Sequence, residues 1–345
     1  MNKKRKSVLL IYTGGTIGMM QDSHSGELRP FNFSALTDQI PELNKFNICL
    51  DAVTFEKPID SSDMHPRNWV KLAEIIKKNY SNYFGFVILH GSDTMAYTAS
   101  ALSFMLEGLS KPVILTGSQL PIGIIRTDGK ENLITAIEIA ATSDKNGKPL
   151  VPEVCIYFEY RLYRGSRTFK YSSSDFDAFK SPNYPELAEA GVEIKFNYPA
   201  IKKATNKKLK VHLNLENDVA VLKVFPGISK KITEAILLTP GLKAVVLETF
   251  GAGNCLTDQW FVELLQSAIR KGVIIVNITQ CHEGSVIQGK YQTSAHLLKA
   301  GVTSGGDLTF EAAITKLMFL LGQNYSAEKV KTLFQNNLRG EITVN

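Results

Sequence analysis

The sequence lacks the features that mark secreted, membrane-spanning and metal-binding proteins. It holds only four cysteines in 345 residues, all widely separated, so neither a disulfide framework nor a paired metal or redox site is expected. No apolar run approaches the roughly 20 residues that cross a bilayer. The apolar run at residues 8–12 ends at Thr13-Gly14-Gly15, too early for a signal peptide and without a cleavage site. A reducing cytoplasm fits these absences, and no membrane partner is predicted.

A strong excess of one charge is also lacking. The net charge is +6, but the lysines are dispersed along the chain and form no stripe with interleaved aromatic residues. The one dense basic run, residues 3–6, lies at the N-terminus, where a solvated tail is the simpler interpretation. No nucleic-acid partner is therefore predicted.

The common hydrolase and cofactor motifs are missing as well. The chain has no Gly-x-Ser-x-Gly elbow, no Walker phosphate loop, no His-Glu-x-x-His pair and no Gly-x-Gly-x-x-Gly turn. Of the six histidines, only His90 lies beside the candidate site described below, and its place at the end of a strand favours a buried structural role. Neither a metal nor a cofactor is expected.

What is present is an alternation of short β-rich apolar runs with helical patterns, typical of an α/β domain with a largely parallel sheet. Pro66 begins one predicted helix and residues 95–106 form another, while Asp128 is a candidate N-cap of a third. The predicted strands of this part are residues 8–12, 86–90, 113–116 and 154–158.

A change in composition near residues 196–212, where lysines are dense and apolar residues few, predicts a domain boundary. The predicted organisation is a larger N-terminal catalytic domain (1–196), a linker (197–212) and a smaller C-terminal α/β domain (213–345). The second domain is predicted to hold strands at 220–224, 244–247 and 273–278, with helices at 259–270 and 310–321.

Glycine-bearing turns that carry hydroxyl or charged groups follow the first-domain strands. In open parallel sheets, ligands bind beyond the carboxyl ends of the strands. Each turn alone has a plain explanation: Asp93 can cap a helix, and Lys170 can be a solvated surface lysine. Together they predict one site. The turns are Thr13-Gly14-Gly15-Thr16-Ile17-Gly18, Gly91-Ser92-Asp93-Thr94, Gly117-Ser118-Gln119 and residues 164–170.

With no histidine base at hand, a hydroxyl nucleophile in this site needs another proton acceptor. A lysine can serve when its pKa is lowered by desolvation and a neighbouring cation or dipole, provided that a carboxylate orients it. Lys170, Asp93 and Ser92 are therefore predicted to form a proton relay.

The motifs resemble those of the bacterial cytoplasmic (type I) L-asparaginases, nearly from end to end. The resemblance extends through Gly251-Ala252-Gly253-Asn254, Thr279-Gln280-Cys281 and the terminal Asn337-Leu338-Arg339-Gly340-Glu341. Its strongest segments are Tyr12-Thr13-Gly14-Gly15-Thr16-Ile17-Gly18, Asp60-Ser61-Ser62-Asp63-Met64, His90-Gly91-Ser92-Asp93-Thr94-Met95 and Arg161-Leu162-Tyr163-Arg164-Gly165-Ser166-Arg167-Thr168-Phe169-Lys170.

The resemblance implies a two-domain asparaginase-like α/β fold that assembles as a homotetramer, a dimer of dimers. It implies L-asparagine as substrate and Thr16 as the nucleophile that forms a β-aspartyl ester. Ser92, Asp93 and Lys170 match the second catalytic triad of the family. The substrate-binding residues implied are Gly15, Asp60, Ser61, Ser62, Ser92, Asp93 and Ser118.

The sequence departs from the family pattern in several places. Ser92 stands where many relatives have threonine. The segment 19–33 is polar and flanked by Gly18 and Gly26, so it is predicted to be a mobile lid that closes over the substrate. It lacks the tyrosine that many relatives place in this lid. Tyr291 of the second domain is a candidate for the missing phenol, the alternative being a structural tyrosine. Cys281 fits a second, effector site for asparagine, but Glu248 stands where an arginine is expected.

Other functions share these motifs. They occur in glutaminase-asparaginases of broader specificity and in the asparaginase-like subunit of an archaeal tRNA-dependent amidotransferase, which carries an additional N-terminal domain. Because one methylene separates glutamine from asparagine, glutaminase activity stays open. A non-catalytic amino-acid-binding protein on the same scaffold is the alternative of a different class.

Overall fold

The structure, a computed structural model, describes residues 6–18, 20–21, 28–29, 40–289 and 292–344. Contacts divide the chain into two compact units, Met1–Leu213 and Asn214–Asn345. The segment predicted as a linker, residues 197–212, lies within the first unit by this division, and its role as a linker stays a prediction. Among the described residues, no helix has both the length and the apolar character needed to cross a membrane.

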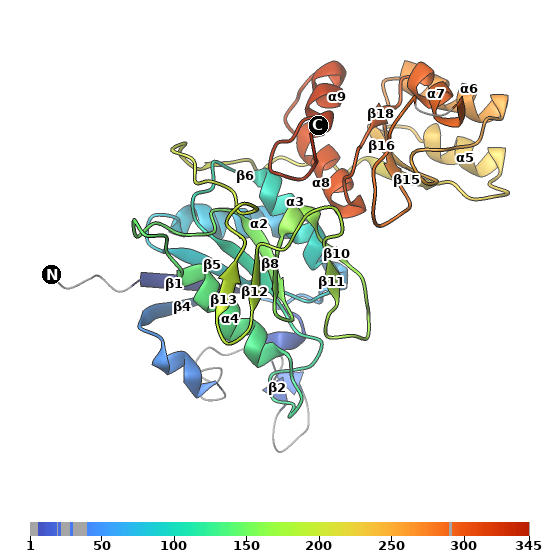
Figure 1. Cartoon of the computed structure of the whole chain (residues 1–345). Coiled ribbons are helices and arrows are strands. Elements are labelled where there is room, and N and C mark those ends of the chain that lie inside the picture. Colours follow the sequence, from blue (N-terminus) through green and yellow to red (C-terminus); the bar gives the residue numbers. More distant parts are fainter. Residues whose placement is uncertain (1–5, 19, 22–27, 30–39, 290–291, 345) are drawn as a thin grey trace. The chain divides into compact units, whose positions relative to one another are not determined.

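An eight-stranded sheet forms the centre of the first unit, with the order β13-β12-β9-β8-β7-β5-β1-β4 (Figure 1). The strands β8, β7, β5, β1 and β4 pair with one another in parallel. The four strands predicted from the sequence, residues 8–12, 86–90, 113–116 and 154–158, correspond to β1, β5, β7 and β8. From β9 onward the pairing is antiparallel. The bounds are β1 (Lys6–Tyr12), β4 (Ile48–Thr54), β5 (Gly85–Leu89), β7 (Val113–Thr116), β8 (Val154–Phe158), β9 (Arg161–Arg164), β12 (Ala188–Ala190) and β13 (Ile194–Phe196).

Helices cover both faces of this sheet (Figure 1). Helix α4 (Gly129–Ala141) packs on the face that receives Val8, Leu10 and Tyr12. Because side chains alternate along a strand, Leu9 and Ile11 point to the other face, where α2 (Pro66–Asn79) and α3 (Met95–Met105) lie. All these β1 residues are almost fully buried, so the apolar run at residues 8–12 reflects a central strand enclosed on both sides.

Short elements lie in the connections between the longer strands and helices. Within the described ranges, the 3₁₀ helices are η1 (Thr16–Gly18), η2 (Pro41–Lys45), η3 (Ser61–Asp63) and η4 (Gly165–Arg167). Three two-stranded pairs join β2 (Met20–Gln21) with β3 (Leu28–Arg29), β6 (Leu106–Glu107) with β14 (Lys210–Val211), and β10 (Phe169–Lys170) with β11 (Phe179–Lys180).

The second unit holds a four-stranded parallel sheet in the order β15-β16-β17-β18. Its predicted strands and both predicted helices are present. The bounds are β15 (Val219–Lys223), α5 (Lys230–Leu237), β16 (Ala244–Thr249), α6 (Gln259–Arg270), β17 (Ile274–Thr279), α7 (Gln292–Ala300), β18 (Thr303–Ser304), α8 (Phe310–Leu321) and α9 (Ala327–Gln335).

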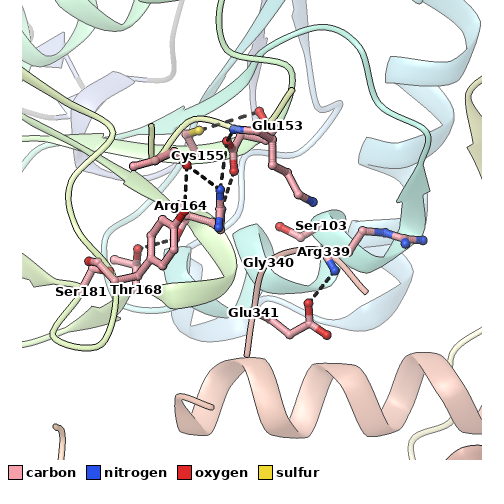
Figure 2. A network of polar contacts seen from close by, with 12 residues as sticks. Ser103, Glu153, Cys155, Arg164, Thr168, Ser181, Arg339, Gly340 and Glu341 are labelled. Carbon is pink, nitrogen blue, oxygen red and sulfur yellow. Dashed lines mark hydrogen bonds and ion pairs between the residues drawn. The ribbon is translucent and has the colours of Figure 1, made fainter. Parts of the chain in front are cut away.

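A buried ion pair fastens the end of the chain to α8. Lys316 Nζ lies 2.5 Å from Glu341 Oε1, and both side chains are fully buried. The Glu341 carboxylate also accepts a hydrogen bond from the backbone N–H of Arg339 (Figure 2). A second comes from the backbone N–H of Leu338. Burial opposes ionisation of Glu341, but the ammonium of Lys316 and these donors outweigh it and lower the pKa of the carboxyl group.

Candidate active site

Three turns of the first unit meet through their backbones. A Cβ atom on Gly14 would lie 2.0 Å from the carbonyl oxygen of Ile59, and one on Gly15 would lie 2.4 Å from the backbone nitrogen of Gly91. A Cβ atom on Gly91 would lie 2.5 Å from Ser61 Oγ. Only glycine permits such approaches, and the positive φ values of Gly14 and Gly15 favour it further. The turns after β1 and β5 therefore pack directly against each other and against residues 59–61. We call this joined backbone surface, made of Gly14, Gly15, Gly91 and residues 59–61, the glycine floor.

Thr16 lies at the edge of this floor. It begins η1, directly after the contact between Gly15 and Gly91, and it is half-buried. The turn is fixed by a backbone hydrogen bond from Gly18 to Gly15 at 3.3 Å and by Tyr12, whose hydroxyl donates to Gly15 O at 3.5 Å. Burial raises the pKa of Tyr12 to about 12, so this phenol stays protonated and holds the turn as a donor.

The segment Asp60-Ser61-Ser62 presents polar groups beside the floor. Asp60 caps η3, and its Oδ1 accepts hydrogen bonds from Ser62 N at 2.9 Å and Ser62 Oγ at 2.8 Å. The backbone donor and then the hydroxyl lower the pKa of Asp60, which keeps its exposed carboxylate charged. Thr94 Oγ1 donates to Ser61 O at 2.6 Å and so joins this segment to the turn after β5.

Lys170 contacts Ser92 and Asp93, the two residues predicted to form a proton relay with it. Its Nζ donates to Ser92 Oγ at 2.8 Å and lies 2.6 Å from Asp93 Oδ1. The lysine side chain is 16% exposed, whereas that of Asp93 is 63% exposed, so the amine is sheltered while the carboxylate faces solvent. Asp93 does not cap a helix, because α3 has Thr94 as its N-cap residue. The structure thus unites residues 92, 93 and 170, as predicted.

The β9–η4 segment that leads to Lys170 is held by a buried ion pair that the sequence did not reveal. Arg164 Nε lies 2.6 Å from Glu153 Oε2, and both side chains are 5% exposed. Arg164 also donates to Ala200 O at 2.9 Å, and its guanidinium lies over the ring of Tyr184. Figure 2 shows Glu153 and Arg164 directed toward each other, with Thr168 nearby. Thr168 Oγ1 donates to Arg164 O at 2.7 Å, two residues before Lys170.

His90 has the structural role that its position predicts. It is fully buried, with Nδ1 2.6 Å from Gly91 O and Nε2 2.9 Å from Thr98 Oγ1. Since Thr98 Oγ1 accepts a hydrogen bond from Trp69 Nε1, its own proton is available to His90 Nε2. Burial lowers the pKa of His90 to about 4, so the ring is neutral at physiological pH and fully engaged.

The remaining predicted site residues are placed as follows. Ser118 is 2% exposed, packs beside Gly129, and has no hydrogen-bond partner for its Oγ among the described residues. Of the predicted lid, only Met20–Gln21 and Leu28–Arg29 are described, and Tyr291 lies outside the described residues. Within the ranges that the structure covers, no group of three or more His, Cys, Asp or Glu residues is arranged to hold a metal ion.

The predicted effector residue, Cys281, lies in the second unit just after β17. It is exposed, and its backbone N–H donates to Thr279 Oγ1 at 3.0 Å. Glu248, at the carboxyl end of β16, has a pKa raised mainly by burial, with Lys223 and His282 acting in the opposite direction. Lys223 Nζ lies 3.9 Å from Glu248 Oε1. This second sheet therefore also has charged groups at its carboxyl edge.

Two family models match most of the chain. The model described as asparaginase, N-terminal, matches residues 7–202, and that described as glutaminase/asparaginase C-terminal domain matches residues 218–334. The chain belongs to the asparaginase family. The asparaginase chain is 44% identical to L-asparaginase 1 of Escherichia coli (strain K12), over 99% of both chains.

A mouse protein and a bacterial crystal structure extend this comparison. The chain is 40% identical to the 60 kDa lysophospholipase of Mus musculus over 98% of its own length and 63% of that protein. The structure is similar to that of L-asparaginase I from Vibrio cholerae O1, with a TM-score of 0.89, 41% identity and coverage of 99% and 100% of the two chains. The family resemblance and the two-domain α/β fold predicted from the sequence are thus confirmed.

Proposed function

We propose that this asparaginase-family protein is an L-asparaginase, which hydrolyses the side-chain amide of L-asparagine to L-aspartate and ammonia. The observation that carries this function is the contact of the Lys170 amine with Ser92 and Asp93 beside the glycine floor next to Thr16. A pure binding site has no need of a sheltered lysine placed against a hydroxyl. The 44% identity to L-asparaginase 1 over nearly the full chain supports the same activity.

The chemistry proceeds through an ester on Thr16. The Thr16 hydroxyl oxygen attacks the side-chain carbonyl carbon of asparagine, and backbone N–H groups of the glycine-bearing turns stabilise the oxyanion, each by roughly 3 kcal/mol. Collapse breaks the C–N bond, and the amine takes a proton and leaves as ammonia. Water then attacks the β-aspartyl ester, releases aspartate and restores the hydroxyl.

Lys170, Asp93 and Ser92 are proposed to move the protons. In its neutral form Lys170 accepts the Ser92 proton, Ser92 Oγ accepts the Thr16 proton, and Asp93 orients the amine. The same groups then return a proton to the leaving nitrogen. Tyr291 is the alternative acceptor for the Thr16 proton. A Tyr291→Phe variant separates the two: unchanged turnover assigns the Thr16 proton to the relay, and a large loss assigns it to the phenol.

The substrate is a zwitterion and needs groups of both signs. Hydroxyl and backbone N–H groups of Ser61, Ser62 and Gly15 are proposed to hold the α-carboxylate, while the carboxylates of Asp60 and Asp93 hold the ammonium. Asp60 is suited to this because its pKa is lowered, with Ser62 as the cause. Ser118 stays a predicted contact, and its buried position favours an indirect role.

We also infer that the enzyme works in the cytoplasm as a homotetramer. The four cysteines, all unpaired, suit a reducing compartment. The tetramer and the effector site at Cys281 derive from the resemblance to type I enzymes. Initial rates measured against asparagine concentration test the effector site: a sigmoidal curve that becomes hyperbolic in a Cys281→Ala variant supports it, and a hyperbolic curve for the parent removes it.

Ammonia release from purified protein tests the function. The parent is expected to turn over asparagine, and Thr16→Ala to lose at least about a thousandfold in kcat. Thr239→Ala is the matched control, since Thr239 is an exposed threonine bonded only locally, to Ala235 O. Binding of asparagine without turnover would assign the chain to the non-catalytic class. Glutamine under the same conditions measures the breadth of specificity.

A further inference from the structure

The turn after β7 carries a side chain that contacts the proposed proton relay. Ser92 Oγ accepts a hydrogen bond from Lys170 Nζ at 2.8 Å and donates its own proton to Gln119 Oε1 at 3.3 Å. At its other end, the Gln119 amide Nε2 donates to Asp175 O at 3.0 Å. Gln119 thus connects the hydroxyl after β5 to the segment between β10 and β11 that directly follows Lys170.

The backbone at Gln119 is held by a buried carboxylate. Asp128, which is 7% exposed, accepts hydrogen bonds from Gln119 N at 3.1 and 2.9 Å and from Leu120 N at 3.1 Å. Asn132 Nδ2 donates to Asp128 Oδ2 at 3.3 Å and to Gly117 O at 3.0 Å. Asp128 was predicted to cap α4, but its side chain makes no capping bond. Its carboxylate instead holds the turn after β7 through the hydrogen bonds from Gln119 N and Leu120 N.

The turn lies directly against the chain that precedes Ser92. A Cβ atom on Gly117 would lie 2.4 Å from the carbonyl oxygen of His90. His90 N in turn donates to Thr116 O at 2.9 Å. Because the two backbones are in contact here, a small change in the side chain at position 119 is not absorbed by a shift of the turn.

We propose that Gln119 is a positioning residue that fixes the Ser92 hydroxyl beside Lys170. This role rests on the proposed function. A serine hydroxyl has three staggered rotamers, and the acceptor at Gln119 Oε1 selects the one in which Ser92 Oγ also meets the amine. In the resting site the Ser92 proton is donated to Gln119 Oε1, and it turns to the amine when Lys170 is neutral. Loss of the Gln119 acceptor lets Ser92 Oγ leave the rotamer that meets the amine. This lowers the rate of proton transfer and leaves the groups proposed to hold the substrate in place.

Steady-state kinetics of two variants test this role. Gln119→Met removes both hydrogen bonds at nearly constant length and is expected to lower kcat about tenfold with KM within about twofold of the parent. Gln119→Glu keeps the acceptor and loses the donor, so its kcat is expected to stay within about threefold. Gln259→Met is the control, because the Gln259 amide bonds only Glu263 on the surface of α6. The melting temperature of each variant reports any general destabilisation.

A double-mutant cycle with Ser92→Ala separates positioning from a structural effect. If Gln119 acts through the Ser92 hydroxyl, Gln119→Met lowers kcat in the parent background but not in the Ser92→Ala background. Equal losses in both backgrounds, an unchanged kcat, or a Gln119→Glu variant as slow as Gln119→Met each overturn the role of Gln119. If the parent and Gln259→Met release no ammonia at all, the proposed function fails and the role of Gln119 falls with it.

Discussion

Lys170 is the residue whose surroundings define the site. Its amine contacts one hydroxyl and one carboxylate and is largely sheltered from solvent. A Lys170→Met variant keeps the length of the side chain and removes the amine, so we expect kcat to fall by about a thousandfold, the range of general base catalysis.

Lys180 provides the matched control for Lys170. It lies on the paired strand β11 and forms an ion pair with Asp177, away from Ser92. Lys180→Met is therefore expected to leave kcat within about twofold. Equal losses in the two variants would show that the hairpin, and not the Lys170 amine, carries the effect.

His90 makes a separate prediction about acid stability. Its pKa is about 4 in the folded chain and 6.5 when unperturbed, so between these values the unfolded chain binds a proton that the folded chain does not. Stability therefore rises with pH across this window and is lost as the pH falls from 6.5 to 4. At 1.36 kcal/mol per pKa unit, His90 accounts for about 3 kcal/mol of the loss.

Urea unfolding at a series of pH values measures this contribution. A His90→Gln variant is less stable at neutral pH because its bonds to Gly91 and Thr98 change, but its stability is expected to fall less steeply below pH 6.5. Parallel curves for parent and variant would show that other groups titrate in this range.

At the scale of elements, the sequence predicts the buried strands well and the edges poorly. All five residues of β5 are buried, so an apolar run is its signature. In contrast, β4 at the sheet edge has only half-buried and exposed positions and contains Asp51, and it was not predicted. Strand β12, Ala188–Ala190, has no β-branched residue and owes its conformation to pairing with β9 and β13.

The same limit applies to the candidate site. The motifs group Lys170 with Ser92 and Asp93, but the strand ends alone do not bring them together. Strand β9 runs antiparallel to β8, so Arg164 at its carboxyl end pairs with Cys155 near the start of β8. Lys170 meets Ser92 from β10, which pairs with β11 in a separate sheet.

The contacts of Gln119 and Arg164 could not be predicted from the motifs. The Asp128 carboxylate binds the backbone of Gln119, and the Glu153 carboxylate binds the Arg164 guanidinium, and in both cases the two partners lie in different segments of the chain. Glu153 offered one signal, a lone carboxylate directly before a strand that is buried throughout.

The Glu153–Arg164 pair predicts how the β9–η4 segment responds to mutation. Glu153→Ala leaves a buried guanidinium without its carboxylate, which is expected to lower the free energy of unfolding by about 3 to 5 kcal/mol. Arg161 and Glu186, from the same sheet region, lie 3.7 Å apart with side chains 40% and 47% exposed. Glu186→Ala is therefore expected to change stability by less than about 1 kcal/mol. Chemical denaturation of both variants gives the comparison.

At the scale of the whole molecule, the mass of the protein in solution tests the proposed tetramer. Sedimentation equilibrium of the purified protein is expected to give four times the mass of one chain. A mass equal to two chains at every concentration would limit assembly to the dimer, and a mass of one chain would contradict the proposed assembly. The same samples assayed for ammonia release show whether activity depends on association.

The positions of β1 in the sheet and of Lys170 in the chain determine how late in synthesis the site can be completed. This strand precedes both of its neighbours in the chain and lies between β4 and β5, so its pairing partners are synthesised after it. The amine of Lys170 arrives later still, on a hairpin that ends at Lys180. A nascent chain therefore has no complete relay of Ser92, Asp93 and Lys170 until that hairpin has emerged.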